Sequence, residues 1–261
     1  MQILFQKFQG AGNDFVMLDN RAHIFKGLST AQIAQLCHRN TGVGADGLIL
    51  VETSDIADFK MVYYNADGHQ SSMCGNGGRC AVAFAKRLKI IQTKTSFEAV
   101  DGLHEAEILS DGMVRLGMMS VSKITSHQDA LVLDTGSPHF VALKDSLAEI
   151  DMQKEGAQIR YSDPFKAEGI NVNFIALTPS GGLNIRTYER GVENETQACG
   201  TGAVAAAIAA DYWGLPCPKN PITLHALGGT LQVDFNKAEK HYKAVYLTGP
   251  VQFVFSGEII C

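Results

Sequence analysis

The run Met73-Cys74-Gly75-Asn76-Gly77-Gly78-Arg79-Cys80 has a counterpart later in the chain, Ala198-Cys199-Gly200-Thr201-Gly202-Ala203. In both runs a cysteine precedes Gly-x-Gly, and an apolar segment that predicts a helix follows. Each cysteine also follows a strand-like segment at a similar distance. Cys74 comes ten residues after Tyr64, which ends the first segment, and Cys199 comes eleven residues after Tyr188, which ends the second. The matched contexts predict one structural unit that is used twice.

A thiol placed just ahead of a helix has a predictable chemistry. It faces unpaired backbone N–H groups and the positive end of the helix dipole, which favours the thiolate. The glycines allow backbone amides to approach an anion closely, so each unit combines a thiol base with a carboxylate cradle. Two such units, related by a pseudo-twofold axis, would place one thiol on each face of a bound α-carbon. That arrangement suits the inversion of a stereocentre.

Size and composition indicate an ordinary soluble globular protein. The chain has 261 residues, of which 46% are hydrophobic and 19% charged, and a formal net charge of −5. These values give no reason to expect binding to nucleic acid or to a membrane surface. The longest apolar run, Ala203–Ala210, is far shorter than the roughly 20 residues that span a bilayer. The start of the chain has a strand-like pattern rather than a signal segment, so we expect a cytoplasmic protein.

The six cysteines predict neither a disulfide scaffold nor a metal site. They form no Cys-x-x-Cys pair and no Cys/His spacing typical of zinc. We therefore expect chemistry without a metal.

Hydrophobic periodicity predicts an α+β fold. Ser29-Thr30-Ala31-Gln32 has the form of a capping box, so a helix is expected behind it. Further helices are predicted after each cysteine and, less regularly, over Ser146–Arg160. The strands cluster around hairpin turns, which argues against a parallel doubly wound sheet. Strands are predicted over 1–9, 15–18, 47–51, 59–64, 94–99, 103–109, 113–118, 131–134, 171–177, 183–188, 222–227, 230–235, 242–247 and 251–255.

The resulting prediction is two pseudo-symmetric lobes, each a curled, mainly antiparallel sheet around a central helix. The active site is expected in the cleft between the lobes. A polar stretch without periodicity, Ser120–Ser126, suggests lobes over 1–120 and 121–261 and leaves open whether the last strand returns to the first lobe. Thr135-Gly136-Ser137-Pro138-His139 is interpreted as a turn.

Seven motifs, in order and spacing, resemble the diaminopimelate epimerase family over essentially the whole chain. They are Gly10-Ala11-Gly12-Asn13-Asp14-Phe15, Thr41-Gly42-Val43-Gly44-Ala45-Asp46-Gly47, Asn65-Ala66-Asp67-Gly68, the run 73–80, Gly136-Ser137-Pro138-His139, Tyr188-Glu189-Arg190-Gly191, and Glu195-Thr196-Gln197-Ala198-Cys199-Gly200-Thr201-Gly202. The resemblance implies two similar lobes and the interconversion of LL- and meso-2,6-diaminopimelate, a reaction of lysine and peptidoglycan-precursor biosynthesis. It also implies a homodimer and no cofactor, pyridoxal phosphate included.

The resemblance assigns roles residue by residue. Cys74 and Cys199 would form the acid/base pair, one thiolate removing the α-proton while the other thiol protonates the opposite face. His139 and Glu189 resemble the polar pair that orients or tunes the thiols, and we include them among the catalytic residues. The positions that would bind substrate are Asn13, Asn65, Gly75, Asn76, Asn171, Glu189, Arg190, Gly200 and Thr201.

Two positions depart from the family pattern. Ser137 stands where asparagine is common, and Gly47 stands where some members carry a glutamine that contacts substrate. Both departures concern recognition of the distal end of the substrate rather than the chemistry.

Two other functions compete with this reading. One is a racemase or epimerase of the proline or hydroxyproline type, which also uses two cysteines. Asn76 and the Glu189-Arg190 pair argue against it, because a long substrate with a second charged end needs additional polar contacts. The other is a redox sensor in which Cys74 and Cys199 form a reversible disulfide.

Overall fold

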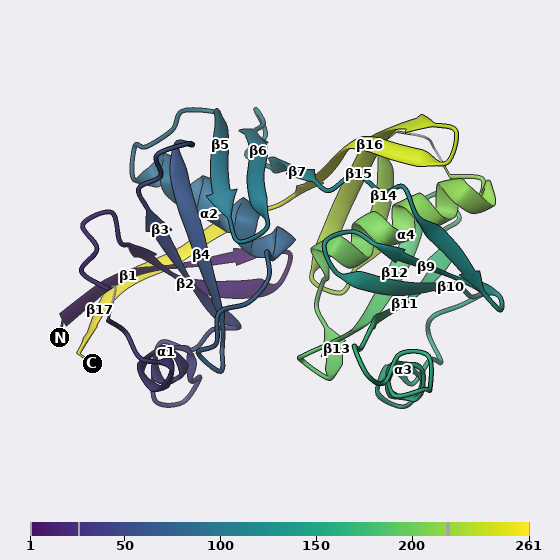
Figure 1. Cartoon of the computed structure of the whole chain (residues 1–261), viewed down its shortest axis with the longest axis horizontal. Helices are drawn as coiled ribbons and strands as arrows, with labels where there is room; N and C mark the ends of the chain where they lie inside the picture. The colour runs from purple at the N-terminus through teal and green to yellow at the C-terminus, as the bar shows by residue number, and fades with distance from the viewer. Residues whose placement is uncertain (1, 26, 218–219, 261) are drawn as a thin grey trace. The chain divides into compact units, whose positions relative to one another are not determined.

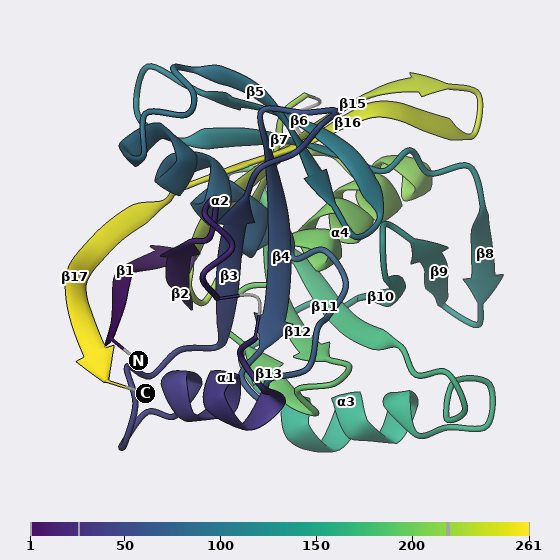
Figure 2. The same ribbon diagram turned by 60° about the vertical axis from the view of Figure 1, so that its left-hand side comes forward.

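The structure, a computed structural model, describes residues 2–25, 27–217 and 220–260, so Met1, at the start of the first predicted strand, lies outside them. The chain forms two compact units (Figures 1 and 2). Unit 1 comprises residues 1–116 and 249–261, and unit 2 comprises residues 117–248. We describe each unit by itself.

Unit 1 contains two helices and eight strands within the described residues, counting the strand at its boundary. They are β1 (Gln2–Gly10), β2 (Asn13–Asp19), α1 (Thr30–Cys37), β3 (Gly47–Glu52), β4 (Phe59–Asn65), α2 (Gly75–Arg87), β5 (Lys94–Ala99), β6 (Gly102–Ile108), β7 (Val114–Met118) and β17 (Gln252–Ile260). Antiparallel pairs join β17 to β1, β1 to β2, β3 to β4, β5 to β6 and β6 to β7. Two pairs, β2 with β3 and β4 with β5, are parallel.

Unit 2 repeats this arrangement. Its elements are β8 (Ile124–His127), β9 (Ala130–Asp134), β10 (Pro138–Leu143), α3 (Met152–Arg160), β11 (Asn171–Leu177), β12 (Leu183–Glu189), β13 (Asn194–Thr196), α4 (Gly200–Trp213), β14 (Ile222–Ala226), β15 (Gly229–Ala238) and β16 (His241–Gly249). The pairs β10 with β11 and β12 with β14 are parallel, whereas the other pairs of this unit are antiparallel.

The repeat is visible in the crossovers. In each unit one short helix, α1 or α3, connects the first parallel pair, and one longer helix, α2 or α4, connects the second. The first parallel pair opens with Phe15 opposite Gly47 in unit 1 and with His139 opposite Asn171 in unit 2. The structure therefore confirms the α+β fold of two similar units that the doubled cysteine motif predicts.

A buried helix lies at the centre of each unit. Ala203–Ala210 of α4 is fully inaccessible, as its lack of polar side chains predicts. Figure 1 shows α4 with β9–β12 on one side and β14–β16 on the other. The helix ends at Gly214, whose left-handed φ of 70° suits a glycine C-cap. In α2, Lys86 and Arg87 occupy the last turn, where cations complement the helix dipole.

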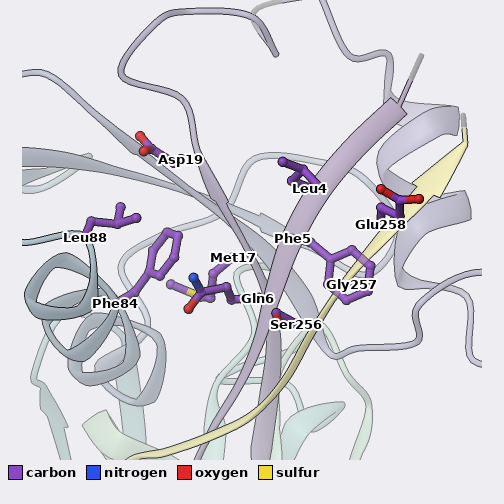
Figure 3. Close-up of a pocket in the computed structure, with 10 residues that line it drawn as sticks. All are labelled: Leu4, Phe5, Gln6, Met17, Asp19, Phe84, Leu88, Ser256, Gly257 and Glu258. Carbon is purple, nitrogen blue, oxygen red and sulfur yellow. The ribbon is translucent and has the colours of Figure 1, made fainter.

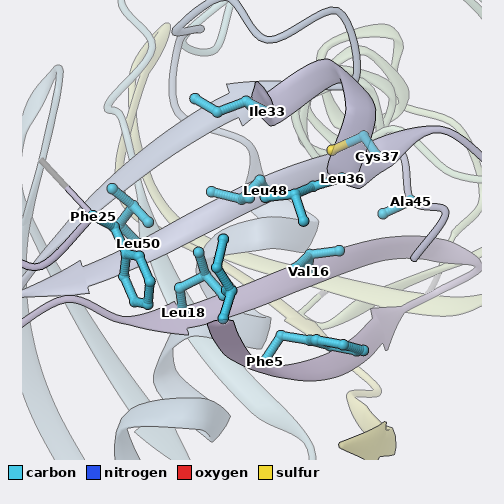
Figure 4. Close-up of a cluster of buried hydrophobic side chains, with 11 residues drawn as sticks. Phe5, Val16, Leu18, Phe25, Ile33, Leu36, Cys37, Ala45, Leu48 and Leu50 are labelled. Carbon is cyan, nitrogen blue, oxygen red and sulfur yellow. The ribbon is translucent and has the colours of Figure 1, made fainter. Parts of the chain in front are cut away.

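The short helices cover the outer faces of the sheets. The capping box predicted for α1 is confirmed, with Gln32 N donating to Ser29 Oγ at 3.3 Å and Ser29 N donating to Gln32 Oε1 at 3.0 Å. The buried face of α1, including Ile33 and Leu36, packs on side chains of β1, β2 and β3 (Figure 4). This layer holds β2, which begins at the predicted site residue Asn13.

Three predictions need correction. The chain divides at Leu116/Gly117 rather than after residue 120, and residues 249–261 belong to unit 1 because β17 pairs with β1, the possibility that the sequence left open. The helix predicted over Ser146–Arg160 begins only at Met152, behind the N-cap Asp151, and the Leu147 and Ile150 carbonyls before it accept hydrogen bonds from Arg186.

The third correction concerns His139. It was interpreted as part of a turn, but Pro138–Leu143 forms β10, a buried strand between β9 and β11. Elsewhere, the described part of the chain has no helix that is both long and apolar enough to cross a membrane.

Candidate active site

Cys74 and Cys199 occupy the same structural position in their respective units. Each is the N-cap of the central helix, with φ/ψ of −104°/119° for Cys74 and −108°/115° for Cys199. Gly77 N donates to Cys74 Sγ at 3.4 Å, and Gly202 N donates to Cys199 Sγ at 3.4 Å. Each sulfur therefore occupies the place of a capping hydroxyl or carboxylate oxygen and receives a backbone amide at the positive end of a helix.

In unit 1 the thiol lies beside a chain of amide side chains. Cys74 Sγ is 3.8 Å from Asn13 Oδ1, and Asn76 Nδ2 is 3.4 Å from the same oxygen. Asn13 Nδ2 donates to Asp46 Oδ2 at 2.6 Å, which fixes the orientation of the Asn13 amide. Three of the predicted site residues of this unit, Cys74, Asn13 and Asn76, are thus brought into one cluster.

Ion pairs hold the turn that carries Asn13 in place. Asp14 forms ion pairs with buried Lys7 at 2.8 Å and with Arg39 at 3.0 Å. Burial alone would raise the pKa of Asp14, but the hydrogen bonds from Arg39 and Lys7 outweigh it and lower the pKa below its ordinary value. Asp46 pairs with Arg39 at 2.6 Å. The turn that carries Asn13 is therefore held by Asp14, which stays ionised at neutral pH, and by the ion pair between Asp46 and Arg39.

The turn between β1 and β2 positions Asn13 next to the first turn of α2. Ala11 and Gly12 both have positive φ, 53° and 85°, as a two-residue hairpin turn requires. A Cβ atom on Gly10 would lie 3.1 Å from both the Asn76 carbonyl oxygen and Cys80 Sγ. Glycine at this position allows the hairpin to approach the first turn of α2 closely.

In unit 2 the first turn of α4 is tied to the strand layer. Cys199 Sγ lies 3.4 Å from Thr201 Oγ1, and Thr201 O accepts a hydrogen bond from Thr135 Oγ1 at 2.9 Å. Thr135 is 1% exposed, so this bond is shielded from solvent. The loop before β10 therefore fixes the backbone that follows Cys199.

His139 is fully buried and neutral. Burial, and then the positive charge of Arg190, lowers the pKa of its imidazole to about 3. Asn173 Nδ2 contacts His139 Nδ1 at 3.0 Å. No described residue provides a hydrogen-bond partner for His139 Nε2. The imidazole cannot serve as a cationic acid at neutral pH.

A second polar cluster of unit 2 gathers Asn171 and Arg190. Asn171 Oδ1 accepts from Arg190 N at 2.8 Å, and Asn171 Nδ2 donates to Ser137 Oγ at 2.9 Å. The Arg190 guanidinium donates to the Glu168 carbonyl oxygen at 3.0 Å and to Ser137 Oγ at 3.4 Å. Ser137, the shorter residue that departs from the family pattern, thus joins this cluster directly.

The remaining predicted positions lie at strand ends. Glu189 ends β12 and accepts from Thr196 Oγ1 at 3.0 Å, and Asn65 ends β4 opposite Gly47. A Cβ atom on Gly47 would lie 2.5 Å from the Tyr64 carbonyl oxygen and 2.6 Å from the Tyr63 ring. The local backbone therefore excludes a longer side chain at this position, and Gly47 can offer only its main chain.

A groove elsewhere on unit 1 contains none of these residues. It is lined mainly by side chains of β1, β17 and the end of α2, among them Leu4, Phe5, Phe84, Leu88 and Glu258 (Figure 3). No group of three or more His, Cys, Asp or Glu side chains within the described ranges could hold a metal ion.

Two buried polar residues of the clusters were not predicted. Asn173 bridges His139 and Thr187, and Arg79 contacts the first residues of α2. Asn173 lies two residues after Asn171 and so points to the same face of β11, which is a signal that the sequence contains. Arg79 lies within the cysteine motif itself, but nothing in its spacing indicates that a cation would be fully buried.

Comparison with known proteins identifies the family. The family profile described as diaminopimelate epimerase matches residues 5–124 and 131–254. A Flavobacterium psychrophilum protein named diaminopimelate epimerase is 51% identical over 253 residues, covering 97% of this chain and 98% of the relative.

Solved structures agree at the level of the fold. A Bacillus anthracis phenazine biosynthesis protein of the PhzF family has a TM-score of 0.76 at 12% identity, with both chains covered completely. A hydroxyproline epimerase from Agrobacterium vitis has a TM-score of 0.71 at 13% identity, covering 99% of this chain and 92% of that one. The length and identity of the sequence match decide the assignment: the chain belongs to the diaminopimelate epimerase family and is an enzyme of the isomerase class.

Proposed function

We propose that the protein interconverts LL- and meso-2,6-diaminopimelate with Cys74 and Cys199 as an acid/base pair, as a step of lysine biosynthesis. Near-full-length relatives that carry the name of this activity support the substrate. The observation that carries the mechanism is the identical N-cap geometry of the two thiols, each receiving a backbone amide at 3.4 Å.

In the proposed reaction the substrate α-carbon lies between the two sulfurs. A thiolate on one side removes the α-proton, so that a C–H bond breaks and an S–H bond forms. The thiol on the other side then delivers its proton to the opposite face, forming the new C–H bond and leaving a thiolate. The two sulfurs have exchanged protonation states, and the reverse reaction follows the same steps in the opposite order.

The backbone of the two helices would stabilise the charge that develops on the reacting carboxylate. The first-turn amides of α2 and α4, at Gly75, Asn76, Gly200 and Thr201, are oriented before substrate arrives. Donors that are fixed in advance need no reorganisation as charge develops, which makes them more effective than water.

The polar clusters would select the substrate. We assign Arg190 to the distal carboxylate, because a guanidinium can donate two parallel hydrogen bonds to it. Asn171 holds the Arg190 main chain and lies in the same cluster, and Asn13 and Asn65 would bind the remaining polar groups. A substrate such as proline has no second charged end to meet these side chains, so the arrangement favours diaminopimelate over the proline-type alternative.

His139 and Glu189 would tune rather than carry the proton transfer. His139 is neutral at physiological pH, so it can donate a hydrogen bond from Nε2 without adding a charge. Glu189 is held by Thr196 at the end of β12. We propose that this pair orients the sulfurs.

Proton NMR of diaminopimelate incubated with the protein in heavy water tests the activity. We expect deuterium at the α-position and a change in the LL to meso ratio, unaffected by a chelator. L-Proline and hydroxyproline serve as alternative substrates, and turnover of either one in place of diaminopimelate would contradict the proposal.

Cysteine variants test the mechanism. Cys74→Ala and Cys199→Ala should each abolish epimerisation, whereas Cys37→Ala, which removes a buried thiol of α1, should not. Assays with and without reductant separate the redox-sensor alternative: the enzyme requires reduced thiols for turnover, whereas a sensor would give a functional output only on oxidation.

A further inference from the structure

Arg79 is a buried cation without a carboxylate partner. It lies on α2 five residues after Cys74, and its side chain is completely inaccessible to solvent. None of the ion pairs among the described residues involves it. An isolated buried charge is strongly unfavourable, so its retention needs a physical explanation.

The contacts of the Arg79 guanidinium are with neutral groups. Nη2 donates to Asn76 Oδ1 at 2.9 Å and Nη1 donates to the Gly75 carbonyl oxygen at 3.4 Å, while Nε has no partner among the described residues. Gly75 and Asn76 are the two residues that directly follow Cys74. The helix dipole adds to the cost, because a cation is unfavourable near a helix N-terminus.

The charged and titratable groups around this turn of α2 have other partners or stay neutral. From β2, Asp14 is paired with Lys7 of β1 and with Arg39, and Asp46 is paired with Arg39. On α2 itself, burial raises the pKa of the Cys80 thiol, so Cys80 stays protonated.

His104 of β6, which packs against α2, is paired with Asp101, and the remaining strands contribute apolar side chains near this turn. Those nearest to Gly77 and Gly78 are Ile49 of β3, Met61 of β4, Phe97 of β5 and Leu116 of β7. Burial lowers the pKa of Arg79 only to about 10, and a negative charge at Cys80 or Cys74 would raise it again. Arg79 therefore remains a cation at neutral pH, and Cys74 is the thiol beside it that can become an anion.

We propose that Arg79 is a positioning residue that holds Cys74 as the thiolate in the resting protein. It does so through its positive charge and through the hydrogen bonds that it donates to Gly75 and Asn76. The equivalent position of unit 2 holds no cation: the residue five positions after Cys199 is Val204, also fully buried. Cys199 accordingly rests as the neutral thiol. This inference refines the proposed function, since it assigns the base of the resting protein to unit 1 and the acid to unit 2.

Alkylation of the reduced protein by iodoacetamide, without substrate, tests the assignment. Peptide mass spectrometry follows Cys74 and Cys199 separately from pH 5 to pH 10. The quantity compared is the midpoint of each pH profile, because Cys199 is only 8% exposed and its absolute rate reflects access. We expect a midpoint for Cys74 well below that of a free thiol, about 8.5, and a higher midpoint for Cys199.

Two substitutions at one position separate charge from packing. Arg79→Met should move the Cys74 midpoint upward by at least one pH unit, which slows alkylation by about tenfold at pH values below both midpoints, and leave the Cys199 midpoint unchanged. Arg79→Lys should retain most of the wild-type midpoint. The matched control is Arg87→Met at the exposed end of the same helix, which should change neither profile. An unchanged Cys74 midpoint in folded Arg79→Met, or a lower midpoint for Cys199 than for Cys74 in the wild type, would overturn the proposal.

A second measurement needs no substitution of Arg79. A thiolate favoured by the folded state stabilises it at high pH, and this contribution is lost as pH falls through the folded-state pKa. The melting temperature lost on Cys74→Ala should therefore be larger at pH 8 than at pH 5, and equal losses would contradict the proposal. Because neither measurement uses diaminopimelate, a thiolate at Cys74 can be established even if the proposed reaction fails.

Discussion

Asn173 holds His139 in one tautomer. The Asn173 amide donates from Nδ2 to the Phe140 carbonyl oxygen at 3.0 Å and accepts at Oδ1 from Thr187 Oγ1 at 2.9 Å, which fixes its orientation. The same Nδ2 therefore donates to His139 Nδ1, at 3.0 Å, and the proton of the neutral imidazole must reside on Nε2. The Nε2–H group of His139 on β10 is thus a buried hydrogen-bond donor whose direction is fixed.

The first prediction is that His139 does not titrate near neutrality. Its folded pKa of about 3 lies below the ordinary 6.5, so the unfolded state binds the extra proton between these values. Stability from this residue is complete above pH 6.5 and is lost as pH falls toward 3, by up to about 1.4 kcal/mol per unit. Urea unfolding from pH 7.5 to 4.5 should show a steeper acid loss in wild type than in His139→Gln. The same pH dependence of the unfolding free energy in both proteins would contradict this prediction.

Asn173→Asp should reverse the tautomer. A carboxylate at this position accepts a proton from Nδ1 rather than donating one, and its charge raises the pKa of the imidazole. ¹⁵N NMR should show a proton on Nδ1 and titration at higher pH than in wild type, together with reduced epimerisation. Asn184→Asp, at an exposed position of β12, is the control and should change neither property.

Gly202→Ala and Gly77→Ala should differ although the two glycines occupy equivalent positions. A Cβ atom on Gly202 would lie 2.5 Å from Asn173 Oδ1 and 3.3 Å from Cys199 Sγ, so the fixed amide must move. A Cβ atom on Gly77 would meet the tip of Ile49 at 3.0 Å, which can yield.

We expect Gly202→Ala to cost about 1–3 kcal/mol of unfolding free energy and most of the activity. Gly77→Ala should be near neutral, because alanine is favoured over glycine within helices by about 1 kcal/mol. Denaturant unfolding and a turnover assay measure both effects, and equal losses would show that the contact with Asn173 is unimportant.

Arg186→Lys should destabilise unit 2. Arg186 donates to both carboxylate oxygens of Glu195, at 2.6 and 2.8 Å, and to the Leu147 and Ile150 carbonyl oxygens. Lysine cannot reproduce this forked geometry, so we expect a loss of about 1.5–3 kcal/mol in thermal or urea unfolding. Arg21→Lys disrupts an exposed pair with Asp19 and should cost less than about 1 kcal/mol.

Local sequence patterns predicted most of the elements and the two cysteine caps. The capping box before α1, the apolar run of α4 and the glycines after each cysteine all act within a few residues, so their physics can be read from the chain. The resemblance assigned both Cys74 and Asn13 to the site, and their contact is seen only in the structure. The joint action of Cys74 and Cys199 on one carbon remains a prediction.

Contacts between distant segments explain what the sequence did not reveal. His139 was assigned to a turn because Pro138 usually marks one, yet neighbouring strands on both sides make Pro138–Leu143 a strand. Helix α3 begins later than predicted. Arg186, about 35 residues further on, donates hydrogen bonds to the carbonyl oxygens of Leu147 and Ile150, which precede the helix. Arg79 and Asn173 are recognisable only once their burial is known.

The pairing of β17 with β1 determines the order in which the molecule can be completed. Gln2 lies opposite Ile260, so the sheet of unit 1 lacks β17 until residues 252–260 have left the ribosome. Unit 2, a continuous stretch from 117 to 248, is by then fully synthesised. Unit 1 is therefore begun before unit 2 and completed after it, and a chain without residues 252–260 would retain every strand of unit 2 but leave β1 without its β17 partner.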